Sequence, residues 1–198
     1  SLDQDTLIEA GGQWDFFKNK GMISGLDERT WTALNAIKLA WRAAHPAITD
    51  FWREIEARVP LALGQYAATN RRPLPVTFSN TPFGLACRLP SGRVMAYPRA
   101  ELPADGEHCL FRYYAPLRVR KGFAMSKTHV GRVVENVTQA TARDVLAANL
   151  ARVEAAGYKI VLSVHDELIT ETPDTPDYTS EKLAAMMATP PKWAADLP

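Results

Sequence analysis

The triplet His165-Asp166-Glu167 is the stretch whose residue types and position could do chemistry. It lies between two apolar runs, 159–164 and 167–171, whose composition predicts strands, so the chain is expected to reverse direction at His165 and Asp166. A carboxylate on a tight hairpin is positioned by backbone hydrogen bonds, which suits a divalent cation such as Mg²⁺. Two-metal phosphoryl transfer needs carboxylates from at least two chain segments, so this triplet alone is too little for an enzyme. An ordinary turn explains the same residues, because Asp is common in turns.

Alternation along the first of these strands predicts that Ile160, Leu162 and Val164 share one face of the hairpin. Val161 and Ser163 are then expected on the opposite face. The pattern therefore assigns the apolar side chains of this strand mainly to one side.

The segment from about residue 131 to 156 predicts a long helix that leads into the hairpin. Glu135, Gln139 and Arg143 recur every four residues and form a polar stripe opposite the apolar one. A Gln and an Arg beside a carboxylate hairpin could read hydrogen-bond acceptors in the minor groove of DNA, where such contacts test pairing shape and not sequence. Taken alone, the stripe is more typical of a solvated helix face.

The other segments predict an α+β fold in two parts. Residues 1–25 show no clear pattern. From Leu26 the periodicity is helical, with one helix ending at His45-Pro46 and a second expected to kink or break at Pro60. Residues 71–198 combine strands and helices. The strands are expected at 85–89, 93–98 and 109–120, the last broken at Pro116, and a final helix near 179–188.

The composition of the chain is that of an ordinary globular protein. Its 198 residues are 46 % hydrophobic and 23 % charged, and a net charge of +1 argues neither for nor against nucleic acid. Arg71, Arg72 and the run 118–121 could contact phosphates or be solvated charge. Cys87 and Cys109 lack zinc-site spacing and are expected to be reduced thiols. Without an apolar run of about 20 residues, we expect no membrane span and a cytoplasmic location.

Several motifs together resemble one family. The stretches ENVTQATARD and AAGYKIVLSVHDELITE closely resemble the C-terminal palm segment of family A DNA polymerases, the bacterial polymerase I type, and particularly its phage-encoded branch. LAWRAAHPAITDFWREIEA, LPSGRVMAYPRA and PPKWAADLP are similar to that branch in the same order. The resemblance covers about 26–198, with a poor match around 100–128. It implies a partial polymerase palm for 71–198, with an antiparallel hairpin packed against long helices, and the helical end of the fingers for 1–70.

The resemblance also implies roles for single residues. Asp166 would be one of two metal-binding aspartates, with Glu167 supporting the metal site and His165 contacting the primer terminus. Gln139 would hydrogen-bond the minor-groove edge of the terminal base pair, and Arg143 would lie on the same DNA-facing stripe. The implied cofactor is a pair of Mg²⁺ ions. The implied partners are primer-template DNA and deoxynucleoside triphosphates, and the implied location of a phage-encoded member is the cytoplasm of a bacterial host.

The sequence departs from the family pattern before this region. Motif A, with the other catalytic aspartate, and motif B, with its nucleotide-gripping Arg, Lys and Tyr, are not found. The stretch 49–59 echoes motif A, but Ile55 follows Asp50 by five residues where the motif needs four, and the stretch is helical. We therefore expect a partner polypeptide that carries motifs A and B and shares the metal site. A half-palm should also leave one sheet face uncovered.

Two other hypotheses remain open. The chain could be a non-catalytic remnant that keeps DNA or protein binding through the helix of Gln139 and Arg143. It could also be a metal phosphohydrolase of the His-Asp type. The β-branched neighbours of the His-Asp doublet disfavour the latter, because those enzymes carry the doublet on a helix.

Overall fold

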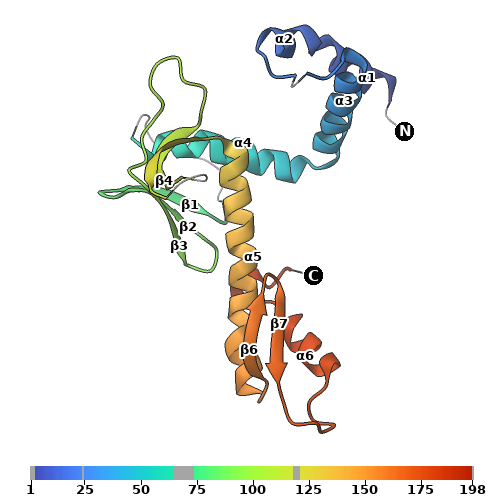
Figure 1. The fold of residues 1–198 in the computed structure, drawn as a ribbon, viewed down its shortest axis with the longest axis vertical. Coiled ribbons are helices and arrows are strands. Elements are labelled where there is room, and N and C mark those ends of the chain that lie inside the picture. Colours follow the sequence, from blue (N-terminus) through green and yellow to red (C-terminus); the bar gives the residue numbers. More distant parts are fainter. Residues whose placement is uncertain (1–2, 24, 65–73, 118–120, 198) are drawn as a thin grey trace. The chain divides into compact units, whose positions relative to one another are not determined.

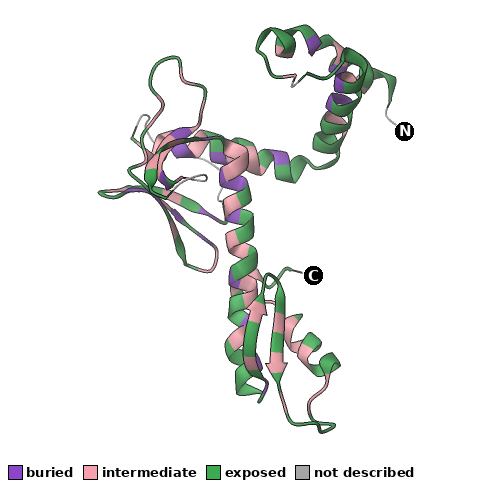
Figure 2. Cartoon of the chain, viewed as in Figure 1, coloured by how far each residue is buried: buried purple, intermediate pink, exposed green. Residues whose placement is uncertain are grey.

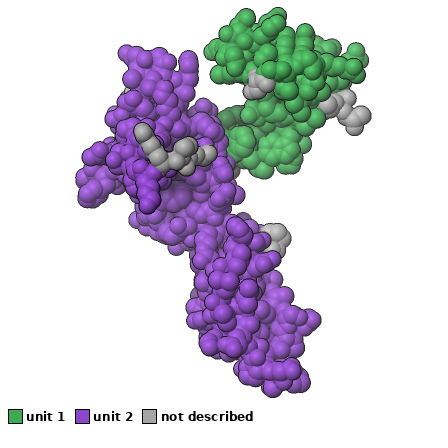
Figure 3. All heavy atoms as spheres, in the orientation of Figure 1, with its two compact units in different colours: residues 1–54 green, residues 55–198 purple. Residues whose placement is uncertain are grey.

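The computed structural model describes residues 3–23, 25–64, 74–117 and 121–197 as a mixture of helices and strands (Figure 1). The chain divides into two compact units, Ser1–Glu54 and Ile55–Pro198 (Figure 3). The boundary expected between residues 70 and 71 lies outside the described residues, as do Arg71, Arg72 and 118–120. In the part of the chain that the structure describes, no helix combines the length and the apolar character that a membrane crossing requires.

Unit 1 is helical. Asp3 and Asp27 act as N-caps, each accepting a hydrogen bond from a threonine amide three residues on, at 2.8 and 3.0 Å. Trp14 packs edge-to-face on Trp31, with ring centroids 5.6 Å apart. His45 ends one helix and Pro46 begins the next, as predicted. The helices are α1 (Gln4–Gly12), α2 (Trp14–Asn19), α3 (Glu28–Ala44) and α4 (Pro46–Ala62). Helix α4 enters unit 2 at Ile55 and is not broken at Pro60.

Unit 2 begins with antiparallel strands. A three-stranded sheet has the order β1-β2-β3, and a separate pair joins β4 to β5. An isolated bridge between Glu101 and Arg112 connects the segment after β3 to β4. Both cysteines are free thiols. The strands are β1 (Thr77–Thr81), β2 (Gly84–Arg88), β3 (Val94–Pro98), β4 (Phe111–Pro116) and β5 (Phe123–Thr128), of which β1 and β5 were not predicted.

The long helix α5 (Val130–Ala155) follows these strands and carries buried residues along its length (Figure 2). Val133 and Val137 are buried on α5, and Phe111 is fully buried on β4. Tyr97 of β3 packs edge-to-face on Phe111 with ring centroids 5.2 Å apart. The core of this part of unit 2 is therefore apolar and aromatic.

The chain then turns back along α5. Strands β6 (Lys159–Val164) and β7 (Glu167–Glu171) pair antiparallel beside the C-terminal half of α5 (Figure 1). Helix α6 (Ser180–Met187) follows, and a short 3-10 helix (Lys192–Ala194) lies near the C-terminus. Asn149 is buried on α5 and donates a hydrogen bond to the Met187 carbonyl at 3.2 Å. The Tyr158 hydroxyl bonds both the amide and the carbonyl of Thr179 at 3.1 Å.

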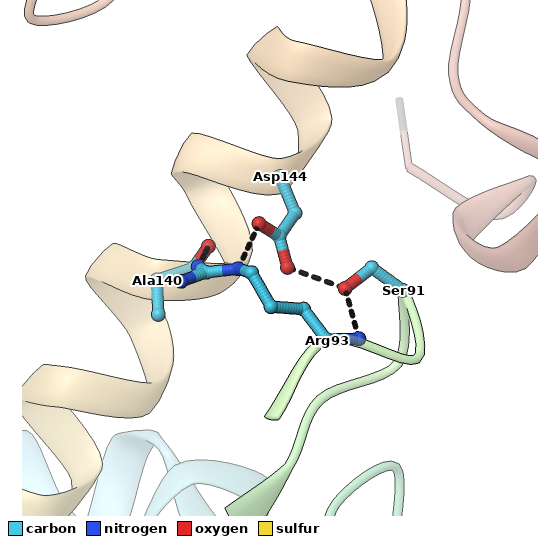
Figure 4. Close-up of polar contacts among 4 residues, drawn as sticks. All are labelled: Ser91, Arg93, Ala140 and Asp144. Carbon is cyan, nitrogen blue, oxygen red and sulfur yellow. Dashed lines mark hydrogen bonds and ion pairs between the residues drawn. The ribbon is translucent and has the colours of Figure 1, made fainter. Parts of the chain in front are cut away.

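One buried carboxylate connects the β2–β3 turn to α5 (Figure 4). Asp144 is 9 % exposed, and its Oδ1 accepts a hydrogen bond from Arg93 Nε at 2.6 Å. The other carboxylate oxygen accepts from the Ser91 hydroxyl. Arg93 Nη2 also donates to the Ala140 carbonyl at 2.8 Å. Since bonds to a charged acceptor are about twice as strong as neutral ones, these contacts fix where the turn lies on the helix.

We predict that Asp144→Ala destabilises unit 2 by about 1–3 kcal/mol in chemical denaturation, because the Ser91 hydroxyl loses its acceptor. The loss stays below that of a fully buried pair, since water can rehydrate the partly exposed Arg93 guanidinium. Glu171→Ala is the matched control, because its pair with Lys159 is exposed, and its loss should be below about 0.5 kcal/mol. Equal losses for the two variants would contradict a stabilising role for the Asp144 contacts with Ser91 and Arg93.

Candidate functional site

The strand pairing places His165 and Asp166 in a two-residue turn. Val164 pairs with Glu167, so only these two residues connect β6 to β7, and the predicted chain reversal is confirmed. His165 has a φ of 51°, which is uncommon for a residue other than glycine and is required at the first position of the tightest hairpin turns. Both side chains are exposed. The turn therefore presents an imidazole and a carboxylate to solvent on a backbone fixed by strand pairing.

The predicted alternation along β6 is wrong. The register shifts between Ile160 and Leu162, so Val161 forms a β-bulge. Beyond a bulge the strand faces exchange, and the half-buried residues of β6 are Ile160 and Ser163. Leu162 and Val164 are instead exposed. The hairpin thus has an uncovered apolar face, made of Val161, Leu162, Val164 and Ile169.

The hairpin supplies two adjacent carboxylates, Asp166 in the turn and Glu167 at the start of β7. Their hard oxygen atoms suit Mg²⁺, which prefers carboxylate and water ligands. Within the described residues, no group of three or more His, Cys, Asp or Glu side chains could hold a metal ion. The donor chemistry therefore fits Mg²⁺, but these two residues form only part of a site.

Helix α5 holds the other candidate residues beside an open hollow of about 550 Å³. Gln139 Nε2 donates to Glu135 Oε1 at 3.2 Å, so the predicted polar stripe is present on the helix. Gln139 and Arg143 both line the hollow. The structure therefore brings the two predicted DNA-contacting residues to one surface, whose lining consists of Arg93, Met95, Ala96, Tyr97, Tyr113, Asn136, Gln139, Ala140 and Arg143.

The sequence reasoning missed Asn136, which lies one helical turn before Gln139 in the same lining. Asn136 Nδ2 donates to the Tyr97 hydroxyl at 3.3 Å. Burial raises the pKa of Tyr97 to about 12, so this hydroxyl is neutral near pH 7. The three-residue spacing of Asn136 and Gln139 on one helix face was the signal that could have identified it.

The hairpin turn and the hollow lie along the same helix. The six residues of β6 run back along α5 over about 18 Å, which corresponds to about twelve residues of helix. The turn therefore lies part-way along α5, away from its C-terminal end (Figure 1). Among the described residues the lining of the hollow includes none from the hairpin. Contact between Asp166 and the Gln139 amide therefore stays a prediction.

Comparison with known proteins gives one informative match. The chain is 37 % identical over 166 residues to a protein named DNA polymerase from Bacillus phage SP02. The match covers 80 % of this chain and 24 % of that polymerase, so the chain spans about a quarter of its relative's length. The chain is thus similar to part of a DNA polymerase, as expected. No protein-family model matches the sequence, and no solved structure matches it.

We predict that the raised pKa of Tyr97 makes unit 2 lose stability as the pH rises. The folded state holds this proton up to about pH 12, whereas the unfolded chain releases it near pH 10. The stabilisation is therefore complete below pH 10 and is lost between pH 10 and 12. Ultraviolet titration of the tyrosines should show a step near pH 12 that is absent in Tyr97→Phe and retained in Tyr114→Phe. A wild-type titration without that step would contradict the burial of the Tyr97 hydroxyl.

Proposed function

We propose that the chain is the C-terminal part of a family A DNA polymerase of the phage type. It supplies one metal-binding aspartate and the primer-terminus contacts for two-metal nucleotidyl transfer. The observation that carries the proposal is the hairpin of β6 and β7, whose two-residue turn bears Asp166 and which is the next element after the helix of Gln139 and Arg143. The 37 % identity to part of a phage DNA polymerase supports it independently.

In this proposal the turn is the metal-binding and primer-facing edge of a palm. The Asp166 carboxylate binds metal, and the neighbouring Glu167 supports the site. His165 contacts the primer terminus, which its exposed place in the turn permits. The hairpin suits this role because strand pairing holds both carboxylates on an ordered backbone.

The hollow beside α5 is the proposed contact surface for the primer-template duplex. The minor groove shows acceptors at similar positions for every base pair, so donors that reach it sense pairing shape. Gln139 and Arg143 supply such donors, and Arg143 is exposed. Gln139 donates one of its two amide protons to Glu135 and retains the other for a base.

The chemistry requires more than this chain. A bound pair of Mg²⁺ ions would stabilise the charge of the attacking and leaving oxygens. Asp166 and Glu167 provide ligands from one segment only, so a polypeptide with motifs A and B must provide the others and bind the deoxynucleoside triphosphate. The uncovered apolar face of the hairpin fits this arrangement, since two strands with an exposed apolar face are marginal alone.

We predict that the purified chain alone shows no template-dependent primer extension, because its metal site is incomplete. Mixed with a polypeptide that carries motifs A and B, it should extend a primer, and Asp166→Ala should lower that rate by more than about a hundred-fold. Duplex binding by Asp166→Ala should stay unchanged. Extension by the isolated chain, or full activity of Asp166→Ala in the mixture, would refute the proposal. Unchanged DNA or protein binding without any reconstituted extension would favour a non-catalytic remnant.

Gln139→Ala should weaken binding of a primer-template duplex by about ten-fold, because one minor-groove hydrogen-bond donor is lost. Thr138→Ala is the matched control, since Thr138 is exposed on the same helix but does not line the hollow. Fluorescence anisotropy with a labelled duplex measures both. Equal affinities for the two variants would remove Gln139 from the interface.

A further inference from the structure

Strand β4 presents different chemistry on its two faces. Tyr113 lines the hollow that contains Gln139, whereas the next residue, Tyr114, lies on the opposite face because strand side chains alternate. Tyr114 stacks on Phe123 of β5, with ring centroids 5.7 Å apart and planes 23° apart. Phe123 is 59 % exposed. The outer face of β4 and β5 therefore carries an aromatic pair that the proposed polymerase chemistry does not use.

Arg99 borders this pair, and Phe83 adjoins Arg99 through a backbone hydrogen bond. The Arg99 guanidinium lies over the Tyr114 ring, 5.0 Å from its centroid. The Phe83 carbonyl accepts the Arg99 amide hydrogen at 2.8 Å, and the Phe83 side chain is 83 % exposed at the β1–β2 turn. We call Phe83, Arg99, Tyr114 and Phe123 the aromatic patch.

The backbone under the patch is tightly constrained. Arg99 has a φ of 51°, in the left-handed region. This conformation is unfavourable for residues other than glycine, and such residues are concentrated at functional sites. Gly84 approaches it so closely that a Cβ at Gly84 would lie 2.6 Å from the Arg99 nitrogen. The Thr81 hydroxyl donates to the Gly84 carbonyl at 2.7 Å. Phe83 and Arg99 are therefore presented by an ordered turn.

The charges on this face are unevenly paired. Arg112 and Lys127 lie on the same outer face and are paired with Glu101 and Glu107. Arg99 has no carboxylate partner within ion-pair distance among the described residues. Exposed rings next to an unpaired guanidinium complement a ligand that is both planar and anionic.

We propose that the aromatic patch binds unpaired bases of single-stranded DNA by stacking. A single strand exposes base faces to aromatic side chains and phosphates to arginine, whereas a duplex hides its base faces. This inference does not rest on the proposed polymerase function, because the patch lies on the face of β4 opposite the Gln139 hollow. Either site can therefore exist without the other.

The test is the affinity of the whole chain for a labelled single-stranded oligothymidine, measured by fluorescence anisotropy. Phe83→Ala and Phe123→Ala should each weaken it by about 5- to 150-fold, the range seen when one stacking residue is lost. Duplex affinity should change less than about two-fold. Phe16→Ala is the matched control, because Phe16 is 57 % exposed in unit 1, and it should leave both affinities unchanged.

Phe83→Leu separates stacking from an apolar protein contact. Leucine keeps the apolar surface but lacks the ring, so oligothymidine affinity should fall as in Phe83→Ala. The high exposure of Phe83 means that neither change disturbs packing.

Absence of single-strand binding by the wild type, equal losses in Phe16→Ala, or full affinity in Phe83→Leu would overturn the inference. So would wild-type self-association that the patch variants abolish without a change in DNA affinity. A failed primer-extension mixture with these affinities intact would count against the polymerase proposal only.

Discussion

The Asp144 carboxylate is the contact on which the arrangement of unit 2 depends. It lies on α5, is nearly inaccessible to water, and accepts hydrogen bonds from both Ser91 and Arg93 at the β2–β3 turn. A buried carboxylate with charged and hydroxyl donors is strongly disfavoured in any other position, so the turn has one place on the helix. Arg93 also donates to the Ala140 carbonyl, and Arg93, Ala140 and Arg143 all line the hollow. The contacts of Asp144 therefore also set the distance between β3 and the helix residues of the hollow.

Helix α5 thereby connects three features that are distant in the sequence. One part of it faces the hollow with Asn136, Gln139 and Arg143. Asp144 comes next along the helix and binds the β2–β3 turn. The C-terminal half of the helix supports the hairpin that carries Asp166 (Figure 1). In the proposed function, α5 would support both a duplex-contact surface and a metal-binding carboxylate, which suits phosphoryl transfer because catalysis there rests on positioning and charge. In the proposed function, α5 supports one carboxylate segment, and the other metal-binding carboxylate comes from a different segment.

The hairpin turn could be predicted from sequence because β-branched residues on both sides of a polar doublet leave few alternatives. The bulge at Val161 could not, since an extra residue in one strand leaves the local pattern unchanged and shows only in the pairing. Strands β1 and β5 were missed because their polar residues are typical of loops, and pairing with a neighbour decides their conformation. Asp144 was indistinguishable from a solvated helix residue, because its partner Arg93 lies 51 positions away. The division into units within α4 likewise depends on tertiary contacts.

The central claim is that the hairpin turn and the Gln139 side chain face the same space. Paramagnetic broadening of nuclear magnetic resonance signals by Mn²⁺, which occupies the same oxygen-ligand sites as Mg²⁺, tests it directly. If the turn and Gln139 face the same space, Mn²⁺ should broaden the His165 amide signal and the Gln139 side-chain amide signals together. Asp166→Asn should remove both effects. Broadening at His165 with sharp Gln139 signals, or broadening of Gln139 that survives Asp166→Asn, would contradict it.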